Sequence, residues 1–459
     1  MASVNRRQFL RWNTALAASL APGLGLVNAM RPIHAATVAG GYKALVCVYL
    51  AGGNDSFNMF VPASGPTHQA YVQARGALAI PASDLLTVNP QTGADTRYGF
   101  HRNMTDVKNL FDDGALGVMA NVGTLIRPIT KNAYETNADS IPDRLFSHND
   151  QSDTWMAGDA NNRYGQGWAG RMMDMLYDNA AIPRPSPSIS IGGNNLWQSG
   201  QDVRAFEVGS SGVGTTHLPY HRGPFKLFDA YNEISAAGKN ASNVYVAEHA
   251  LRQERAIEFS RYVNAALENA PEFNEVSGGP LAEQLRMVAR LIAVRDQLDP
   301  DRSVNRQVYF VQLGGWDTHA NQNGGEISHP NLLGQLSVAL GRFNDAINSI
   351  GIQNQVTTFT ATEFGRSLTP NGSGTDHGWG GHSLVMGGAV NGNTVHGTLP
   401  QLAINSDDTV ENNRIIPTSS VDQYGATLAR WFGMNESELN TLFPNLQNFD
   451  QRDMGFLRM

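Results

Sequence analysis

The most restrictive feature of the chain is a set of short, uninterrupted apolar runs that end in polar or glycine-rich segments. Residues 44–50 read Ala-Leu-Val-Cys-Val-Tyr-Leu, and Gly52, Gly53, Asn54 and Asp55 follow them. A β-branched run without alternation is typical of a parallel strand that is buried on both faces. Similar runs occupy residues 115–122, 188–191, 307–313 and 356–362. The sequence therefore predicts a central sheet of buried strands.

Segments with helical periodicity lie between these runs. Apolar residues recur at helical spacing through residues 281–298, just before Pro300, and again through residues 332–350. Strands that alternate with helices predict an α/β fold with a doubly wound, mostly parallel sheet and helices on both faces. Ligands bind such sheets beyond the carboxyl ends of the strands. We therefore expect one shared rim for the residues that follow strand-like runs, namely Asp55, Asp317, His319 and Glu363.

The middle of the chain has a different composition. Residues 161–223 are rich in Gly, Ser, Asn and Pro, and residues 230–273 have a helical, one-sidedly charged pattern. These patterns indicate an irregular and helical insertion, or cap, at about residues 161–280. The prediction is one α/β domain over residues 37–459 that carries this insertion.

The first residues predict export. Residues 5–11 read Asn-Arg-Arg-Gln-Phe-Leu-Arg, which is typical of a twin-arginine signal, and the mildly apolar stretch behind them is too interrupted to span a bilayer. We expect a twin-arginine signal peptide over residues 1–36 and a periplasmic or secreted protein, exported folded, with no stable membrane span. A chance arginine pair on a membrane anchor is the alternative.

Cysteine usage and charge narrow the function classes. Cys47 is the only cysteine, so no intramolecular disulfide can form, and its apolar neighbours predict a buried side chain. The formal net charge is −8, and removing the four arginines of the predicted signal gives −12. Such an acidic chain is not expected to bind nucleic acid. A small anionic ester remains compatible if a metal supplies positive charge.

Asp317 and His319 form the first candidate ligand pair. They alternate behind an apolar run, and in an extended segment both side chains point to the same side. Carboxylate oxygen and imidazole nitrogen suit Zn²⁺ or Mn²⁺, with Mg²⁺ or Ca²⁺ as alternatives. A turn-capping aspartate beside a surface histidine is the competing interpretation.

Two further segments carry candidates. Glu363 ends a strand-like run in Thr-Glu-Phe-Gly-Arg366, where Glu363 would bind the metal and Arg366 would stabilise an anionic oxygen. A buried Glu–Arg ion pair is the alternative. Asp376, His377 and His382 lie in or beside a segment with many glycines, which permits close backbone approach, and we interpret them as further metal ligands.

Ser147 and His148 precede Thr154-Trp155, in a polar cluster that could also be a helix N-cap. Together with the Gly-Gly-Asn-Asp55 segment, Gly-Gly-Trp-Asp-Thr-His319, Thr-Glu-Phe-Gly-Arg366 and Gly-Thr-Asp-His-Gly378, they resemble the exported bacterial domain-of-unknown-function family numbered 1501. The resemblance covers almost the whole chain after the predicted signal.

This resemblance implies the alkaline phosphatase and sulfatase superfamily and a hydrolytic site with one or two metals. It implies that Asp55 is the first-strand ligand, that Asp317 and His319 are the Asp–His pair, and that His377 or His382 is the last ligand. Phe364 stands where that superfamily places a histidine. The Cys/Ser-x-Pro-x-Arg sulfatase motif is absent from the sequence, so the attacking group would be Ser147, His148 or a metal-activated water.

The sequence favours an exported metal-dependent hydrolase of a phosphate, phosphonate or sulfate ester. The alternative is a catalytically degenerate relative that serves as an exported binding or assembly protein with a protein partner. A serine esterase fits poorly, because the Gly-Asp-Ser-Leu nucleophile block is missing.

Overall fold

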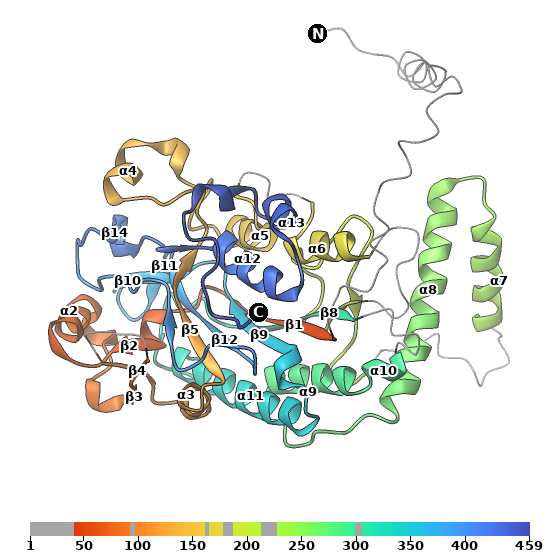
Figure 1. The fold of residues 1–459 in the computed structure, drawn as a ribbon, viewed down its shortest axis with the longest axis horizontal. Coiled ribbons are helices and arrows are strands. Elements are labelled where there is room, and N and C mark those ends of the chain that lie inside the picture. Colours follow the sequence, from red (N-terminus) through yellow and green to blue (C-terminus); the bar gives the residue numbers. More distant parts are fainter. Residues whose placement is uncertain (1–40, 92–96, 161–164, 178–186, 213–226, 299–304) are drawn as a thin grey trace, which may run out of the picture.

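A computed structural model describes residues 41–459 except 92–96, 161–164, 178–186, 213–226 and 299–304. The predicted signal peptide, residues 1–36, lies outside the described residues. The centre of the molecule is a nine-stranded sheet (Figure 1). Its order is β13 (Val395–His396), β5 (Leu116–Gly123), β12 (Gly381–Met386), β9 (Val356–Ala361), β1 (Lys43–Ala51), β8 (Arg306–Gly314), β6 (Ser188–Ser190) and β7 (Phe206–Glu207), with β16 (Ser419–Ser420) also paired to β5.

All five predicted strands are present, as β1, β5, β6, β8 and β9, and all belong to this sheet. Their pairings are parallel, except that β12 runs antiparallel to both β5 and β9. The predicted α/β class with a mostly parallel sheet is confirmed. The sequence did not predict β12, because we interpreted the residues leading into it as a glycine-rich loop.

The side chains of β1 alternate between two cores. Val46, Val48 and Leu50 pack with residues of α3 (Thr105–Asp112), α9 (Pro280–Ala293) and α11 (His329–Ser349) on one face. Leu45, Cys47 and Tyr49 pack with residues of α6 (Trp168–Leu176) and α12 (Val421–Phe432) on the other. Because successive strand residues point to opposite faces, an uninterrupted apolar run is what a doubly covered strand requires. Burying each large side chain contributes about 1.5–3 kcal/mol.

The helix predicted over residues 281–298 is two helices, α9 and α10 (Arg295–Leu298). The backbone leaves the helical region at Val294, where φ is −100° and ψ is 14°. The apolar periodicity continues across this break because both helices cover the same face of the sheet, as Leu285 and Leu298 share one core. The sequence pattern could not show the interruption.

The remaining elements surround this core. They are α2 (Gly65–Arg75), α4 (Lys131–Thr136), α5 (His148–Ala157), α7 (Leu227–Lys239), α8 (Val244–Leu267), α13 (Glu436–Leu442), a small sheet of β2 (Phe60–Pro62), β4 (Tyr98–His101) and β3 (Leu85–Val88), and the pairs β10 (Arg366–Pro370) with β11 (Thr375–His377) and β14 (Thr409–Val410) with β15 (Arg414–Ile415).

The region predicted as a cap is divided in space. Strand β6 joins the central sheet, whereas α7 and α8 lie at the opposite end of the molecule from β10 and β11 (Figure 1). None of the helices in the described part of the chain has the length and apolar character to cross a bilayer.

Strand register sets where the polar loops begin. Ala51 of β1 pairs with Gly314 of β8, and Tyr49 pairs with Ala361 of β9. The carboxyl ends of these three neighbouring strands therefore lie at one edge of the sheet. The loops that carry Asp55, Asp317 and Glu363 all start at this edge, as predicted for a shared rim.

Candidate metal centre

Four side chains converge above the carboxyl ends of β1, β8 and β9. Asp317 and His319 lie in the loop after β8, His148 begins α5, and His377 ends β11. The Nε2 atom of His319 is 3.2 Å from Asp317 Oδ1, and that of His377 is 3.6 Å from the same oxygen. The Nε2 atom of His148 is 3.5 Å from Asp317 Oδ2. We call these four residues the His–Asp centre.

Each histidine of the centre is held from behind by an acceptor. His148 Nδ1 is 2.7 Å from Glu363 Oε1, and His377 Nδ1 is 2.6 Å from the carbonyl oxygen of Phe146. His319 Nδ1 is 3.3 Å from Asp376 Oδ1. Carboxylates and carbonyls accept hydrogen bonds, so this network assigns the proton of each neutral ring to Nδ1. All three Nε2 lone pairs then face Asp317, as they do when histidines bind a metal.

Two observations show that the centre fits a cation. The Nε2 atoms of His319 and His377 are only 2.8 Å apart, and two facing lone pairs repel unless a cation or a proton lies between them. The Nε2 atom of His148 is buried and has no hydrogen-bond partner among the described residues. Three imidazole nitrogens and a carboxylate are donors that Zn²⁺ and Mn²⁺ accept. Ligand atoms of His148, Asp317 and His377 lie within 4.8 Å of one another.

Arg366 keeps Asp317 in place. It is fully buried, and its Nη1 donates to Asp317 Oδ1 at 2.9 Å and to the carbonyl of Gly52 at 3.2 Å. Its Nε and Nη2 donate to the hydroxyl and carbonyl of Thr375. Burial alone raises the pKa of Asp317, but the hydrogen bond and charge of Arg366 and the nearby histidines outweigh it and lower the pKa overall. Asp317 is therefore held ionised, as a metal ligand must be.

Glu363 is buried and well satisfied. It accepts from the backbone N–H of Gly52 at 2.8 Å in addition to His148. The hydrogen bond from His148 to Glu363 is the main cause of a raised pKa of His148, while burial acts in the opposite direction. Glu363 thus acts on the centre through His148 and does not face it directly.

Gly52 allows this crowded arrangement. Its φ is +123°, and a Cβ atom there would lie 2.3 Å from the backbone nitrogen of Asp317. Only glycine accommodates both the positive φ and the close approach. The glycine pair that follows β1 therefore lets the loops after β1 and β8 touch.

The centre is open to solvent. The side chains of Asp317, His319 and Asp376 are 45%, 43% and 40% exposed. Closed metal sites that only stabilise a fold keep all positions filled by protein, whereas catalytic sites leave one accessible. A ligand or a water molecule could therefore reach Asp317 and His319 from solvent.

The predicted site residues fall into three groups according to their distance from the centre. Asp317, His319, His377 and His148 face one another, and Glu363, Asp376 and Arg366 lie one hydrogen bond or ion pair further out. Asp55, His382 and Ser147 lie elsewhere.

Asp55 is fully buried, and its two carboxylate oxygens are taken by Arg75 and by Gln322 Nε2, the latter at 2.5 Å. This carboxylate stabilises the loop below the centre. Its position after β1 was predictable, but its partner Arg75 comes from α2 and carried no signal in the sequence.

His382 is buried in strand β12 and not in a loop. Its Nδ1 accepts from the backbone N–H of Asn121 at 3.2 Å, and its ring lies edge-on to Phe57. Burial lowers its pKa to about 3. We predicted convergence from the glycines before it, but the strand turns this side chain into the core.

Ser147 is the N-cap residue of α5, and its hydroxyl donates to Asp150 Oδ2 at 2.7 Å. A helix N-cap was the alternative that the sequence offered for this cluster, and Ser147 occupies that position. Sequence reasoning also missed the carbonyl of Phe146, because a backbone acceptor cannot be recognised from residue type.

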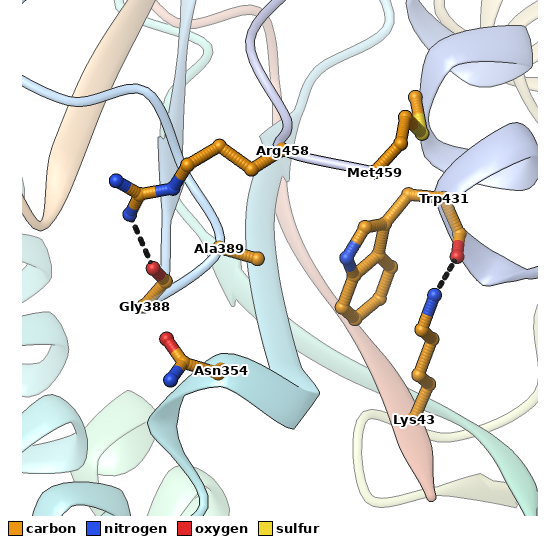
Figure 2. Close-up of a pocket in the computed structure, with 7 residues that line it drawn as sticks. All are labelled: Lys43, Asn354, Gly388, Ala389, Trp431, Arg458 and Met459. Atoms are coloured by element: carbon orange, nitrogen blue, oxygen red, sulfur yellow. Dashed lines mark hydrogen bonds between the residues drawn. The ribbon is translucent and has the colours of Figure 1, made fainter. Parts of the chain in front are cut away.

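A cavity of about 550 Å³, shown in Figure 2, lies beside the start of β1, whereas the His–Asp centre lies beyond the carboxyl end of that strand. It is lined by Lys43, the first residue of β1, by Asn354, which lies two residues before β9, and by Trp431 and Arg458. Lys43 and Arg458 each donate to a backbone carbonyl, of Trp431 and Gly388 respectively (Figure 2). The cavity is therefore separate from the rim that carries the candidate ligands.

Comparisons with known proteins give a family but no activity. No curated protein matches the chain significantly. Among solved structures, it is similar to the C-terminal periplasmic domain of EcEptC from Escherichia coli in complex with Zn, with 10% identity, 76% of this chain and 74% of that chain covered, and a TM-score of 0.32. It is also similar to Ps i-CgsB (9% identity, 89% and 77% covered, TM-score 0.37) and to the PsFucS1 sulfatase from Pseudoalteromonas sp. (10%, 91% and 74%, TM-score 0.33). At these identities and TM-scores, the likeness says nothing about what this chain binds or catalyses.

A family model matches most of the chain. It covers residues 42–425, from the start of β1 into α12, and so includes every residue of the His–Asp centre. The chain belongs to the family described as protein of unknown function, DUF1501.

Proposed function

We propose that His148, Asp317, His319 and His377 bind one divalent cation, Zn²⁺ or Mn²⁺, and that the protein uses it to hydrolyse a phosphate, phosphonate or sulfate ester. The observation that supports this best is the convergence of three Nε2 atoms on Asp317 while each Nδ1 faces an acceptor. Mg²⁺ and Ca²⁺ prefer oxygen ligands and fit three imidazoles less well.

When bound, such a cation polarises an ester oxygen and brings the pKa of water close to neutrality. The residues of the chain supply positioning. Glu363 fixes the ring of His148, and Arg366 fixes the carboxylate of Asp317. The exposed side of Asp317 and His319 leaves room for an ester to approach from solvent.

Water is the attacking group in this proposal. The Ser147 hydroxyl is engaged by Asp150, and His148 faces the centre as a ligand. Arg366 is saturated by protein acceptors, so it orients Asp317 and does not contact the substrate.

A second candidate is an exported, non-catalytic binding or assembly protein. Three carboxylates lie in or next to the centre, those of Asp317, Glu363 and Asp376, and the guanidinium of Arg366 is engaged by protein acceptors. An anionic ester would therefore depend on the cation alone for attraction, which favours a protein that only holds a metal. In both versions we propose export through the twin-arginine signal over residues 1–36.

The first test is the metal content of full-length protein exported through its own signal, measured by plasma mass spectrometry. His377→Ala is the test variant, and His249→Ala, an exposed histidine of α8, is the matched control. We expect near-stoichiometric Zn or Mn in the parent and the control and a clear loss in His377→Ala. Absence of a transition metal from the parent would refute the proposal.

Catalysis is tested separately with nitrophenyl phosphate, phosphonate and sulfate. Hydrolysis that chelation removes, that Zn²⁺ or Mn²⁺ restores, and that His377→Ala lacks would support the enzyme. Bound metal without turnover of any ester would favour the second candidate.

A further inference from the structure

One arginine contacts two of the three segments that carry histidines of the centre. Arg414, in β15, lies over the ring of Phe146 with its guanidinium carbon 3.9 Å from the ring centroid. Its Nε also donates to the backbone carbonyl of His377 at 2.7 Å. Phe146 is two residues before His148, so a single guanidinium connects the turn before α5 to the end of β11.

The turn that Arg414 covers has an unusual backbone. Phe146 has a φ of +72°, and Arg144 has a φ of +51°. Positive φ is rare for a bulky residue and persists only where surrounding contacts enforce it. In this conformation, the carbonyl of Phe146 accepts from His377 Nδ1 at 2.6 Å. The strained residue is thus itself the acceptor that orients one of the candidate ligands.

The contacts of Arg414 suit it to hold such a turn. Its side chain is 13% exposed, so the contact with the Phe146 ring is largely shielded from water, which strengthens a cation–π interaction. Its partner Glu411 is more distant, at 3.6 Å, and 64% exposed. The planar guanidinium can lie over the ring while its N–H groups donate in fixed directions.

We propose that Arg414 is a positioning residue of the metal centre. It clamps Phe146 in its strained conformation and fixes the backbone of His377, so that His148 and His377 present their Nε2 atoms together before a metal arrives. This inference rests on the proposed metal site and adds a residue outside the ligands and their direct partners. The chain gains metal affinity because the clamp has already ordered both segments.

The test titrates Co²⁺ into metal-free full-length protein and follows its visible absorption, which reports both affinity and ligand geometry. The variants are Arg414→Gln, Arg414→Lys and Phe146→Leu. Arg430→Gln is the matched control, since Arg430 of α12 is 18% exposed and pairs with Glu436 and Asp453 away from the centre. Thermal unfolding of each metal-free variant reports general damage to the fold.

We expect Arg414→Gln and Phe146→Leu each to weaken Co²⁺ binding about 10–100-fold and to change the absorption band, as loss of outer contacts does in metal sites. The Co²⁺ affinity of Arg414→Lys should lie between those of Arg414→Gln and the parent. Because Arg414 and Phe146 share the contact between the guanidinium and the ring, the loss of Co²⁺ affinity in the double variant should be smaller than the sum of the two single losses. Arg430→Gln should behave as the parent does.

Two results would overturn the clamp while leaving the metal site intact. One is Co²⁺ affinity and spectrum of Arg414→Gln that match those of the parent, and the other is fully additive losses in the double variant. If Arg414→Gln does not fold, Phe146→Leu and Arg414→Lys carry the same test. A parent that binds no Co²⁺ would instead refute the proposed function, and the clamp with it.

Discussion

His319 Nε2 lies 2.8 Å from His377 Nε2, and both nitrogens lie within 3.6 Å of Asp317 Oδ1. His319 lies in the loop after β8 and His377 ends β11, and their Nδ1 atoms face Asp376 Oδ1 and the carbonyl oxygen of Phe146, respectively. With both protons on Nδ1, the two Nε2 lone pairs face each other, and a cation between them removes their repulsion. The cation that we propose for this centre would therefore stabilise the rim.

Metal should stabilise the folded protein measurably. A ligand that binds only the native state at about 100 times its Kd adds about 2.7 kcal/mol to the free energy of unfolding. We expect Zn²⁺ to raise the Tm of chelator-treated protein and His377→Ala to abolish the increase, with calorimetry as the measurement. An equal increase in both proteins would place the binding elsewhere on the chain.

Glu363→Gln should weaken the centre without emptying the space that Glu363 fills. The amide can no longer hold the proton of His148 Nδ1 as a carboxylate does, so we expect metal affinity to fall about 10–100-fold. Exposed Glu254→Gln, on α8, is the control, because Glu254 pairs only with Lys239 on the surface among its described contacts. Competition titration against a chromophoric chelator measures the difference, and unchanged affinity would remove Glu363 from the centre.

The same substitution should change how metal binding depends on pH. The hydrogen bond to Glu363 raises the pKa of His148 in the metal-free protein. As the pH falls, protons therefore begin to compete with the metal for His148 at a higher pH than they would without Glu363. Glu363→Gln should move the onset of this competition to lower pH. Metal affinity measured from pH 8 to pH 5 decides the point, and an onset that does not move would show that another group controls it.

Gly52→Ala should disrupt the rim more than an alanine substitution usually does. The new Cβ would lie 2.3 Å from the backbone nitrogen of Asp317, at a φ of +123°. We expect about 2–4 kcal/mol of destabilisation and loss of metal binding, because the loop after β8 must move. Gly351→Ala is the control, since its φ is also positive, at +71°, but nothing lies within 4 Å of its Cβ position. Denaturant unfolding compares the two, and equal losses would contradict the steric argument.

Three buried histidines should make the metal-free protein sensitive to acid. Burial lowers the pKa of His382 to about 3 and that of His101 and His329 to about 4, from an ordinary 6.5. Below pH 6.5 the unfolded chain binds protons that the native state does not, so stability is full above that pH and falls towards pH 4. Each histidine adds about 1.4 kcal/mol per pH unit to this slope.

His382→Phe isolates one of these contributions. Phe57 and Phe60 flank the ring, so the substitution keeps an aromatic side chain but leaves the Asn121 N–H without its acceptor. We expect about 1–3 kcal/mol lower stability at pH 7 and a shallower decline between pH 6 and pH 5. Urea unfolding at the three pH values measures both, and an unchanged slope would show that His382 is not buried as a neutral ring.

The sequence was sufficient for five strands of the central sheet and for the edge at which the polar loops gather. An apolar run such as that of β1 reflects burial on both faces, which is a local property of residue types. Asp317 and Glu363 lie just behind such runs, and the geometry of parallel sheets places both residues at the same edge. Periodicity could not reveal the antiparallel β12, whose apolar residues follow a glycine-rich segment.

Which residues face one another was decided only by the tertiary structure. Asp55 and Glu363 both follow strands, yet Asp55 meets Arg75 of α2 and Glu363 meets His148 of α5. The role of each carboxylate depends on the partner that packing brings to it, and those partners are far away in the sequence. The backbone of Phe146, with its positive φ, depends likewise on Arg414 and His377. The sequence by itself determined the donor types and the sheet edge, because both are local properties. Folding decided the order of ligands and outer partners, because contacts between distant segments leave no local pattern.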